Sequence, residues 1–596
     1  MIYAHKVHRR REPRIGGHEM FKTDSAKRLV GAFRVIVLLT PLVLLLMSLS
    51  AITAVWCWMA SPVALAYAPI DSGAQLDCVS YAPFREHQSP WNSEIVISSD
   101  QIADDLAQLA KLSKCVRIYS VENGLDKVPE LASKVGLKVI LGAWIGRDRM
   151  KNAQMIESTL SLVKLYPEVI TAIIVGSEVL LRGEMFALDL RQTIRSVKAQ
   201  VSIPVSYADV WEFWMRNPDV SDDVDFVTVH MLPYWEDFPV RAEDAAAHVD
   251  DLRKQMVAAF PGKEILIGET GWPSTGRMRD GALPSRINQA RFISELLDRA
   301  RREDFRVNMF EAYDEPWKRQ WEGTVGGHWG LLDGDNRKLK YPTGGTISNY
   351  PFWKLQLACG LALCISVFGS ALLALRRRRA TPELASWAAV ATSATVGGIL
   401  LGVTAEKTLY ESYGLGWLAR GLLLILAITA PLLCSNAYIY GRTLPTFLEL
   451  IGPRQSRTRS PSSMILGFTL MATTMTALES ALGLVFDPRW RDFPFAGLTM
   501  AVVPFWTLTL LNRQKPGKRA IAEAVFASLF AIAALYILFN EGSQNWQALW
   551  TCIVYFMLGT TLWQPRSVVA LEADLFGVES GALRPIAVNA TREPSQ

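Results

Sequence analysis

Short apolar runs and amphipathic segments alternate along the middle of the chain. Runs rich in β-branched residues predict strands at 77–82, 115–119, 137–143, 169–175, 203–208, 224–230, 264–269 and 306–310. Segments with helical periodicity predict helices at 102–112, 126–135, 153–165, 189–200, 242–259 and 285–302. Strand and helix alternating eight times over roughly 270 residues is typical of an α/β fold, the (β/α)₈ TIM barrel.

Long apolar stretches flank this predicted barrel on both sides. One runs from about 33 to 60, long enough to cross a hydrocarbon core of ~30 Å. Because it exceeds the roughly 7–15 apolar residues of a signal peptide, an uncleaved anchor is favoured, with cleavage near 64–66 as the alternative. Seven more stretches predict an all-α transmembrane bundle, at 353–375, 385–405, 417–440, 464–486, 494–511, 520–539 and 546–563.

Basic residues mark alternate connections between these stretches. They gather at 376–379, 454–459 and 513–519 and in the N-terminal tail, which the positive-inside rule places in the cytoplasm. The predicted order is a cytoplasmic tail at 1–32, an anchor at 33–60, a periplasmic barrel at 73–350, an inner-membrane bundle at 351–565 and a cytoplasmic tail at 566–596. The net charge of +5 therefore reflects topology and gives no reason to expect nucleic acid as a partner.

Composition agrees with a chain that lies in a lipid bilayer. Half of the residues are hydrophobic and the mean hydropathy is +0.16, too apolar for an ordinary soluble enzyme. Of seven cysteines, only Cys78 and Cys115 fall in the predicted barrel. A disulfide between them is conceivable in an oxidising compartment but is not favoured, because sequence cannot fix its geometry. No Cys/His cluster has metal-ligand spacing, and we expect no metal or cofactor.

Two glutamates end predicted strands and carry the candidate chemistry. Glu178 closes the sequence Val-Gly-Ser-Glu at 175–178, and Glu269 follows Ile-Leu-Ile-Gly at 265–268. A barrel presents acids in such positions at its open, C-terminal face. Two carboxylates are the minimum set for glycosidic bond chemistry, and a retaining pair stands about 5 Å apart.

The order of several motifs resembles glycoside hydrolase family 17, the β-1,3-glucanases and retaining glucanosyltransferases. The resemblance covers about 77–332, and no single motif in it is specific. The motifs are VSYAPF at 79–84, VRIY at 116–119, VGSE at 175–178, VDFVTVH at 224–230, PYW at 233–235, GETGWPS at 268–274 and EAYDEPWK at 311–318.

This resemblance implies roles for individual residues. The acid/base falls on Glu178 and the nucleophile on Glu269, with Arg117 either keeping Glu269 ionised or forming a structural ion pair. Ser177 stands where the family usually has an Asn that binds the donor sugar, so details of the donor site differ, and Tyr234 is a further supporting residue. The expected sugar-binding residues are Tyr81, Tyr119, Trp144, His230, Trp235, Glu236, Trp272, Glu311, Glu315, Trp317 and Lys318.

A barrel between one span and a bundle is similar to a bacterial membrane form of the family that works in cyclic β-(1,3)(1,6)-glucan synthesis beside a separate glucan synthase. We therefore expect a membrane-bound transglycosylase that acts on periplasmic β-1,3-glucan and forms or branches with β-1,6 linkages. The alternatives are a membrane-bound endo-β-1,3-glucanase and a glucan-binding or export module without turnover. Glu479, inside the apolar stretch 472–486, is expected to serve a polar path or only the structure.

Overall fold

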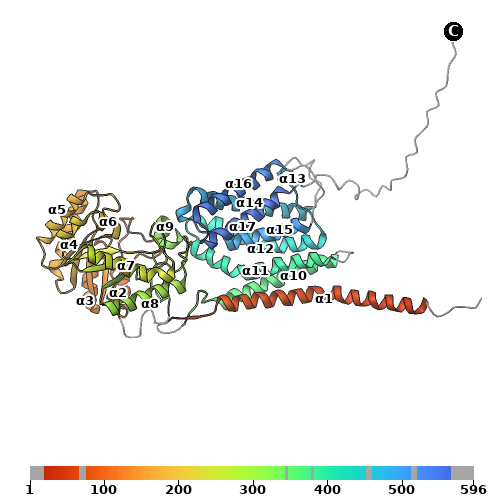
Figure 1. Cartoon of the computed structure of the whole chain (residues 1–596), viewed down its shortest axis with the longest axis horizontal. Coiled ribbons are helices and arrows are strands. Elements are labelled where there is room, and N and C mark those ends of the chain that lie inside the picture. Colours follow the sequence, from red (N-terminus) through yellow and green to blue (C-terminus); the bar gives the residue numbers. More distant parts are fainter. Residues whose placement is uncertain are drawn as a thin grey trace, which may run out of the picture.

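The computed structural model describes residues 19–65, 75–341, 346–377, 382–451, 460–511 and 520–564, with side chains from Leu39 onward. A β/α barrel occupies one end of the molecule and a helical bundle the other (Figure 1). Helix α1 spans Glu19–Met59, and its C-terminal part runs along the bundle. Residues 1–18 of the predicted N-terminal tail, the predicted C-terminal tail and most of the basic clusters lie outside the described residues, whereas 19–32 belong to α1.

Eight parallel strands close into the barrel, as the sequence predicts. They are β2 (Cys78–Ser80), β3 (Cys115–Ile118), β4 (Lys138–Ala143), β5 (Ile170–Ser177), β6 (Val205–Val210), β7 (Val227–His230), β8 (Ile265–Thr270) and β9 (Val307–Met309). β9 pairs with β2 and completes the ring. Their central residues, such as Val79, Val116 and Ile267, are fully buried. The carboxyl ends of all eight strands therefore open on one face.

The predicted helices surround the barrel. They are α2 (Ser99–Leu109), α3 (Val128–Val135), α4 (Arg149–Leu165), α5 (Ala187–Lys198), α7 (Ala242–Ala259) and α8 (Arg286–Glu303), joined by the short helices α6 (Trp211–Arg216) and α9 (Arg319–Gly326). Ser98, Asp148 and Ser285 cap α2, α4 and α8 by accepting hydrogen bonds from free backbone N–H groups. In α2, Ile102, Leu106 and Leu109 recur at helical spacing and are buried, as an amphipathic helix on a barrel requires.

Cys78 and Cys115 form a disulfide, contrary to the sequence-based preference for free thiols. They begin the neighbouring strands β2 and β3, which pair with Val79 opposite Val116. That register brings the two Cα atoms to 4.4 Å, within the range that a disulfide spans. The sequence placed both cysteines at strand starts, but only the pairing of the strands fixed their separation.

All seven predicted C-terminal stretches are helical. They form α10 (Trp353–Arg377), α11 (Leu384–Glu411), α12 (Gly416–Tyr440), α14 (Pro461–Phe486), α15 (Phe495–Leu511), α16 (Ile521–Glu541) and α17 (Trp546–Trp563), with a short α13 (Phe447–Ile451) before α14. Among the described residues six helices are long and apolar enough to cross a membrane: Leu39–Met59 of α1, α10, α11, α12, α14 and α16. Eight spans are expected from sequence, and α15 is apolar but shorter.

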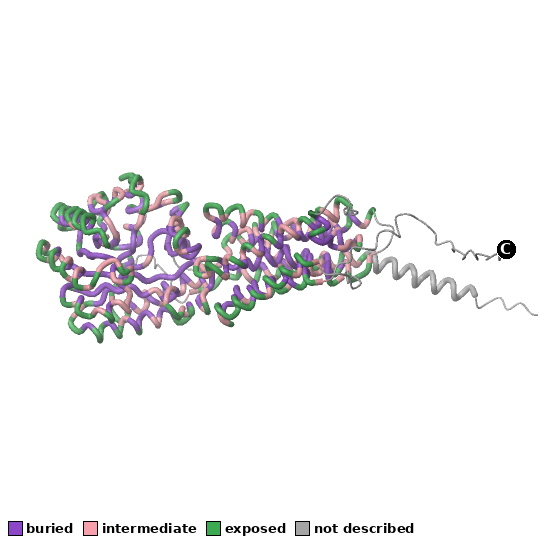
Figure 2. The backbone as a smooth tube through the Cα atoms, turned by 90° about the horizontal axis from the view of Figure 1, so that it is seen from above, coloured by how far each residue is buried: buried purple, intermediate pink, exposed green. Residues whose placement is uncertain are grey.

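Small residues let the helices of the bundle pack closely. A Cβ at Gly360 of α10 would lie 2.1 Å from the carbonyl oxygen of Gly398 in α11, so only glycine fits at this crossing. Trp56 of α1 is buried nearby and meets the ring of Tyr350 edge-on, with centroids 5.5 Å apart. Helix α1 is thus packed into the bundle, whose outward faces remain exposed along its length (Figure 2).

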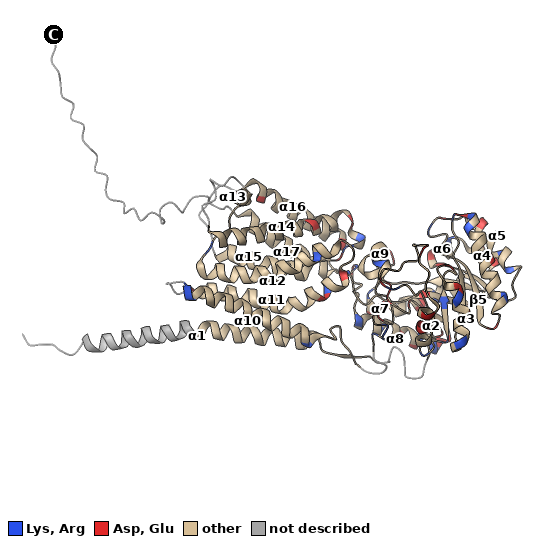
Figure 3. Ribbon diagram, turned by 180° about the vertical axis from the view of Figure 1, so that it is seen from behind, with Lys and Arg blue, Asp and Glu red and all other residues tan. Residues whose placement is uncertain are grey.

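The open face of the barrel points at the bundle. Arg277, in the loop after β8, forms an ion pair with Glu541 at the end of α16. The backbone N–H of Met278 donates to Gln547 Oε1 at 3.0 Å, and Asn545 Nδ2 donates to the Met278 carbonyl at 2.9 Å. Charged residues are scarce along the bundle helices and recur where the bundle meets the barrel (Figure 3).

Helix α9 makes a second junction with the bundle. Gly323 has a φ of 70°, and a Cβ there would lie 2.6 Å from the Trp490 carbonyl oxygen, so a glycine is required for this close approach. Thr324 Oγ1 donates to Asp492 Oδ2 at 2.6 Å beside it. The loops after β8 and β9 therefore hold the barrel mouth against one end of the bundle.

Candidate active site

Glu178 and Glu269 meet across the barrel mouth. Glu178 directly follows β5, and Glu269 lies in β8. One oxygen of each carboxylate and a ring nitrogen of His230 all lie within 4.8 Å of one another. Before Glu178 the pairing of β5 with β6 shifts between Ile174 and Ser177, and Gly176 and Glu178 have positive φ angles of 85° and 55°. This departure from regular strand geometry changes the direction of the Glu178 side chain, as bulges near active sites often do.

His230, at the end of β7, lies between the two carboxylates. Its Nδ1 lies 2.8 Å from Glu178 Oε1, and its Nε2 lies 3.3 Å from Glu269 Oε1. The ring is buried, and burial lowers the pKa of His230 to about 4. It is therefore neutral at ordinary pH, and it hydrogen-bonds Glu178 through Nδ1 and Arg117 through Nε2 rather than acting as a cation.

Arg117 supplies the fixed positive charge beside Glu269. Its Nη1 donates to the Gly268 carbonyl at 2.7 Å and lies 3.6 Å from Glu269 Oε1. Its Nη2 donates to Ser177 Oγ at 3.4 Å. The expected proximity of Arg117 and Glu269 is thus present, and Ser177 also contacts the guanidinium from the Glu178 side.

Tyr119 is the tyrosine that reaches Glu269. Its hydroxyl lies 2.8 Å from Ser80 Oγ and hydrogen-bonds the carboxylate of Glu269. Burial and the charge of Glu269 raise the pKa of Tyr119 well above its ordinary value, so it stays a neutral donor. Tyr234, the expected supporting residue, instead donates its hydroxyl to the Arg277 carbonyl at 2.9 Å.

Glu178 occupies a different environment from Glu269. Its side chain is 29% exposed, yet burial of the carboxylate raises its pKa, against the opposing charges of Arg182 and Arg117. Arg182 covers the ring of Trp144, with its guanidinium carbon 4.2 Å from the centroid. A carboxyl with a raised pKa keeps its proton to higher pH, which suits a general acid.

Sequence reasoning missed Arg182 and Asp209. Asp209 ends β6 and hydrogen-bonds with Tyr207, and burial raises its pKa to about 7. Its position gives the same signal that singles out Glu178, an acid at the end of an apolar strand. Arg182 follows Glu178 by four residues in a loop, and no pattern marks its return to the site.

A second group of charges lies after β9. Lys318 Nζ donates to Glu311 Oε2 at 2.6 Å and lies 3.2 Å from Glu315 Oε2. Burial, then the charge of Glu315, raises the pKa of Glu311 well above its ordinary value. Glu311 Oε1 is buried without a hydrogen-bond partner among the described residues, so it is a free acceptor or donor for a sugar hydroxyl.

The predicted aromatic residues divide into two groups. Trp144 and Trp317 lie at the mouth, each with its ring edge-on to that of Trp91 at a centroid distance of 6.4 Å. Tyr81 and Trp272 are fully buried away from the carboxylates: Tyr81 donates to Asp105 of α2, and Trp272 donates to the Leu283 carbonyl. These two residues hold helices and loops to the barrel.

Trp235 and Glu236 lie on the rim that faces the bundle. The Trp235 ring stacks with Trp329 and meets Trp490 of the bundle edge-on at 5.8 Å. The Glu236 carboxylate accepts from Trp211 Nε1 at 3.3 Å. Both side chains therefore already have protein partners in this structure.

Glu178, His230 and Glu269 together have the composition of a small metal site. The Arg117 guanidinium lies 3.6 Å from Glu269 and 3.2 Å from His230 Nε2. A fixed cation at this distance repels a metal ion from the same atoms. The cluster therefore suits proton transfer and nucleophilic attack better than metal binding.

Comparison with known proteins identifies the barrel. A sequence model of the BtgE/BtgC glycoside hydrolase domain matches residues 78–330. Glucan 1,3-beta-glucosidase of Candida albicans is 28% identical over 260 residues, 40% of this chain and 84% of that protein. Glucan 1,3-beta-glucosidase of Schizosaccharomyces pombe is 30% identical over 262 residues, 41% of this chain and 80% of that protein. The chain belongs to glycoside hydrolase family 17.

Among solved structures, a family 17 β-1,3-glucanosyltransferase from Rhizomucor miehei is 26% identical to this chain. It covers 45% of this chain and 97% of its own length, with a TM-score of 0.39. Membership of family 17 makes the chain an enzyme of the glycoside hydrolase or transglycosylase type. The resemblance inferred from the order of motifs is confirmed at the level of the family.

Proposed function

We propose that this family 17 enzyme is a membrane-anchored retaining glucanosyltransferase that acts on β-1,3-glucan. The observation that carries the proposal is the separation of Glu178 and Glu269, which place carboxylate oxygens within 4.8 Å of each other. Retaining pairs stand about 5–5.5 Å apart, whereas inverting pairs leave about 6.5–9.5 Å for a water. Relatives named as glucan 1,3-beta-glucosidases support β-1,3-glucan as the substrate.

In the first step Glu269 attacks the anomeric carbon and Glu178 gives its proton to the departing glycosidic oxygen. Arg117 and Tyr119 orient Glu269. Burial raises the pKa of Glu178, which favours the protonated acid before the step. The glucan is then covalently bound to Glu269, and the leaving chain carries the proton from Glu178.

In the second step Glu178, now a carboxylate, takes a proton from an incoming hydroxyl whose oxygen attacks the anomeric carbon and releases Glu269. Water as the acceptor gives hydrolysis and a sugar hydroxyl gives transfer. A held sugar can exceed bulk water in effective molarity by ~10⁵ or more. The aromatic rings of Trp91, Trp144 and Trp317 at the mouth support such holding.

The helices support the proposed domain order, with an anchor at 33–60, a barrel at 73–350 and a bundle at 351–565. Trp56 and Ile52 of α1 are buried in the bundle core, which favours a retained anchor over a cleaved signal peptide. Large apolar side chains of α16, such as Ile532 and Phe539, face outward. Water disfavours such a surface and lipid suits it.

We place the barrel in the periplasm at the inner membrane. The α11–α12 and α16–α17 connections, which are poor in Lys and Arg, lie on the barrel side of the bundle, and the sequence has its basic residues in other connections, at 376–379, 454–459 and 513–519. The Cys78–Cys115 disulfide also suits an oxidising compartment. A separate glucan synthase in the same membrane is the proposed source of the glucan.

The deciding experiment supplies purified full-length protein with laminaripentaose and resolves the products by length and linkage. Products longer than the donor indicate transfer, and methylation analysis separates β-1,6 from β-1,3 bonds. We expect elongated products with β-1,6 linkages or branches. Exclusively shorter products would replace this proposal with the alternative, a membrane-bound endo-β-1,3-glucanase.

A further inference from the structure

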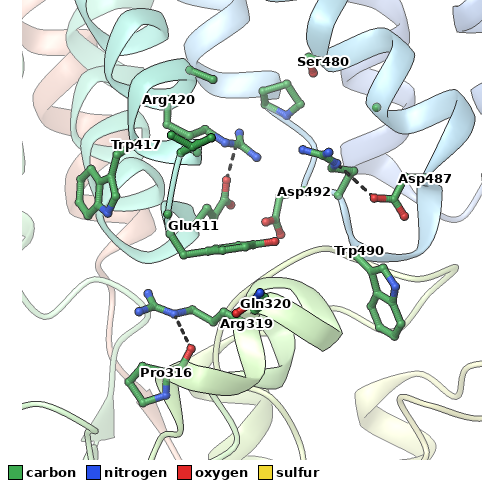
Figure 4. A pocket seen from close by; sticks show the side chains of 18 of the residues that line it. Pro316, Arg319, Gln320, Glu411, Trp417, Arg420, Ser480, Asp487, Trp490 and Asp492 are labelled. Atoms are coloured by element: carbon green, nitrogen blue, oxygen red, sulfur yellow. Dashed lines mark hydrogen bonds and ion pairs between the residues drawn. The ribbon is translucent and has the colours of Figure 1, made fainter. Parts of the chain in front are cut away.

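A large cavity separates the barrel mouth from the bundle (Figure 4). Its volume is about 1010 Å³, at the top of the range of small-molecule sites, roughly 300–1,000 Å³. The barrel contributes the loop after β2 and the segment 316–320 after β9. The bundle contributes the α11–α12 connection, the second half of α14 and the α14–α15 loop. The cavity therefore exists only where both parts of the chain meet.

Aromatic rings line this cavity from both sides. Trp317 comes from the barrel, and Tyr413, Trp417 and Trp490 come from the bundle. Flat apolar faces beside hydrogen-bonding groups suit a pyranose ring, which has an apolar C–H face and a rim of hydroxyls.

The charged residues of the cavity are mutually paired. Arg420 Nη1 lies 3.3 Å from Glu411 Oε2, and Arg491 Nε lies 3.5 Å from Asp487 Oδ2. Arg491 Nη1 also lies 3.9 Å from Glu479 Oε1, so the carboxylate expected in a polar path lines this cavity. With every one of these cations facing a carboxylate, the lining favours a neutral ligand over a phosphate or an anionic lipid headgroup.

The third arginine of the lining also has partners. Arg319 donates from Nε to the Pro316 carbonyl at 3.2 Å and from Nη1 to the Tyr410 carbonyl at 3.4 Å. Its guanidinium bridges barrel and bundle at the edge of the cavity (Figure 4). It therefore closes the wall instead of presenting a free cation.

Asp492 has a carboxylate oxygen at the cavity that forms no hydrogen bond among the described residues. Its side chain is 6% exposed and lines the cavity, and Oδ2 accepts from Thr324 of α9. Oδ1 is buried with no hydrogen-bond partner among the described residues. Burial, with the charge of Glu411, raises the pKa of Asp492 to about 6. A buried carboxyl oxygen in this state requires a partner, and a ligand hydroxyl supplies one.

An aromatic path joins the cavity to the catalytic pair. The Trp317 ring packs edge-on against Trp91, and Trp91 packs against Trp144. Arg182 covers Trp144 and hydrogen-bonds the carbonyl of Ser177, the residue before Glu178. A glucan chain bound at Glu178 thus has a continuous row of rings along which to extend towards the bundle.

We propose that the cavity is a distal glucan-binding site, in which the bundle residues Trp417 and Asp492 hold glucosyl units remote from the bond that reacts. This inference rests on the proposed function, because it assigns a second part of the same β-glucan to the cavity. It makes the bundle a wall of the substrate site in addition to an anchor. Only glucan chains long enough to reach from Glu178 past Trp317 gain binding energy from this distal site.

The test compares laminaritriose with laminariheptaose on the full-length protein in lipid nanodiscs. Trp417→Ala and Asp492→Asn should each lower kcat/KM for the heptaose about tenfold and leave that for the triose unchanged, because only the longer chain reaches the cavity. Trp58→Ala is the matched control. Trp58 lies at the same end of the bundle, is 77% exposed and does not line the cavity.

Binding to the Glu269→Gln protein decides the inference independently of turnover. Calorimetry should show that Trp417→Ala weakens heptaose binding about tenfold and triose binding not at all. Equal losses for both sugars, or none for either, would overturn the distal site. Displacement of the heptaose by phosphatidylglycerol would overturn it in favour of a lipid site. A protein that binds the heptaose in this way but turns over no glucan would retain the site and refute the proposed function.

Discussion

The barrel and the bundle both bury an apolar core, but they differ in the polar residues that they bury. The barrel has an apolar core around β2 to β9, and its mouth buries charged groups such as Arg117, Glu269 and Glu311. The bundle also has an apolar core, but the polar residues that it buries are mostly hydroxyl-bearing, among them Ser435 and Thr473, and large apolar side chains such as Ile532 also face outward. With the bundle in a membrane, as proposed, one chain contacts two solvents, water and lipid. Water rewards burial of apolar surface, whereas lipid rewards close helix packing and internal satisfaction of polar groups.

The difference also separates two uses of buried charge. In the barrel, Arg117 and His230 contact the two carboxylates proposed to react, of which Glu178 must change protonation state. At the junction, Arg277 and Glu541 neutralise each other and hold the two parts together. Chemistry therefore belongs to the barrel, while the bundle contributes position and, by inference, a wall of the substrate site.

The sharpest test of this division is loss of the reactive carboxylates. Glu269→Gln should reduce kcat by about 10⁴-fold or more, because the nucleophile is absent. Glu178→Gln should cost about 10²–10⁴-fold, and azide should restore cleavage of an activated glucoside, because no acid is needed for a good leaving group. Glu157→Gln, an exposed position on α4, is the control. Equal and mild effects at Glu178 and Glu269 would refute both assignments.

Removing one charge of the junction should loosen the barrel from the bundle. Arg277→Met leaves Glu541 buried and unpaired, at a cost of about 3–5 kcal/mol in stability. Thermal unfolding of the detergent-solubilised protein measures this loss of stability. The double variant with Glu541→Gln should recover much of the loss, since the uncompensated charge is gone. An unchanged melting temperature in the single variant would contradict a structural role for the pair.

Introducing a charged residue on the outer surface of the bundle and of the barrel tests whether the two surfaces face different solvents. Ile532→Asp, at the middle of α16 where the side chain is 65% exposed, should cost about 2.5–3.5 kcal/mol of membrane insertion. Met150→Asp, on α4 where the side chain is 75% exposed, should change stability by less than about 0.5 kcal/mol. An insertion assay of α16 and denaturant unfolding of the barrel measure the two effects. Tolerance of Ile532→Asp would indicate that this face does not contact lipid.

The smallest expected effect is on the pH profile. Activity should fall as pH rises through the pKa of Glu178, because the ionised acid has no proton to donate. Asp209, whose pKa is raised to about 7, is negative above that pH and opposes ionisation of Glu178. Asp209→Asn should therefore move the alkaline limb of kcat/KM to lower pH by less than about one unit. Asp126 forms an exposed ion pair with Lys127, and Asp126→Asn should leave the pH profile of kcat/KM unchanged.

The periodic parts of the structure were predictable from local pattern. Eight strands, the main barrel helices and seven C-terminal helices all follow runs that the sequence displays. Six helices among the described residues are long and apolar enough to span; of the eight predicted spans, α15 falls short in length and α17 is not one of the six. Glu178 and Glu269 were also predictable as candidates, since an acid that ends a barrel strand must lie at the open face.

Pairing between distant segments was not predictable in the same way. Tyr119 and Tyr234 both follow strands, yet only Tyr119 reaches Glu269, because side-chain direction depends on strand register and tilt. The Cys78–Cys115 bond likewise depends on the register of β2 and β3.

The sequence by itself determined which segments are strands and helices, which are apolar enough to span a membrane, and which acids end strands, because these properties depend on neighbours along the chain. Only the tertiary structure decided that the barrel mouth faces the bundle and that Asp492 closes a cavity with Trp317. Those contacts join residues far apart in the chain, and their geometry follows from how all the elements pack at once.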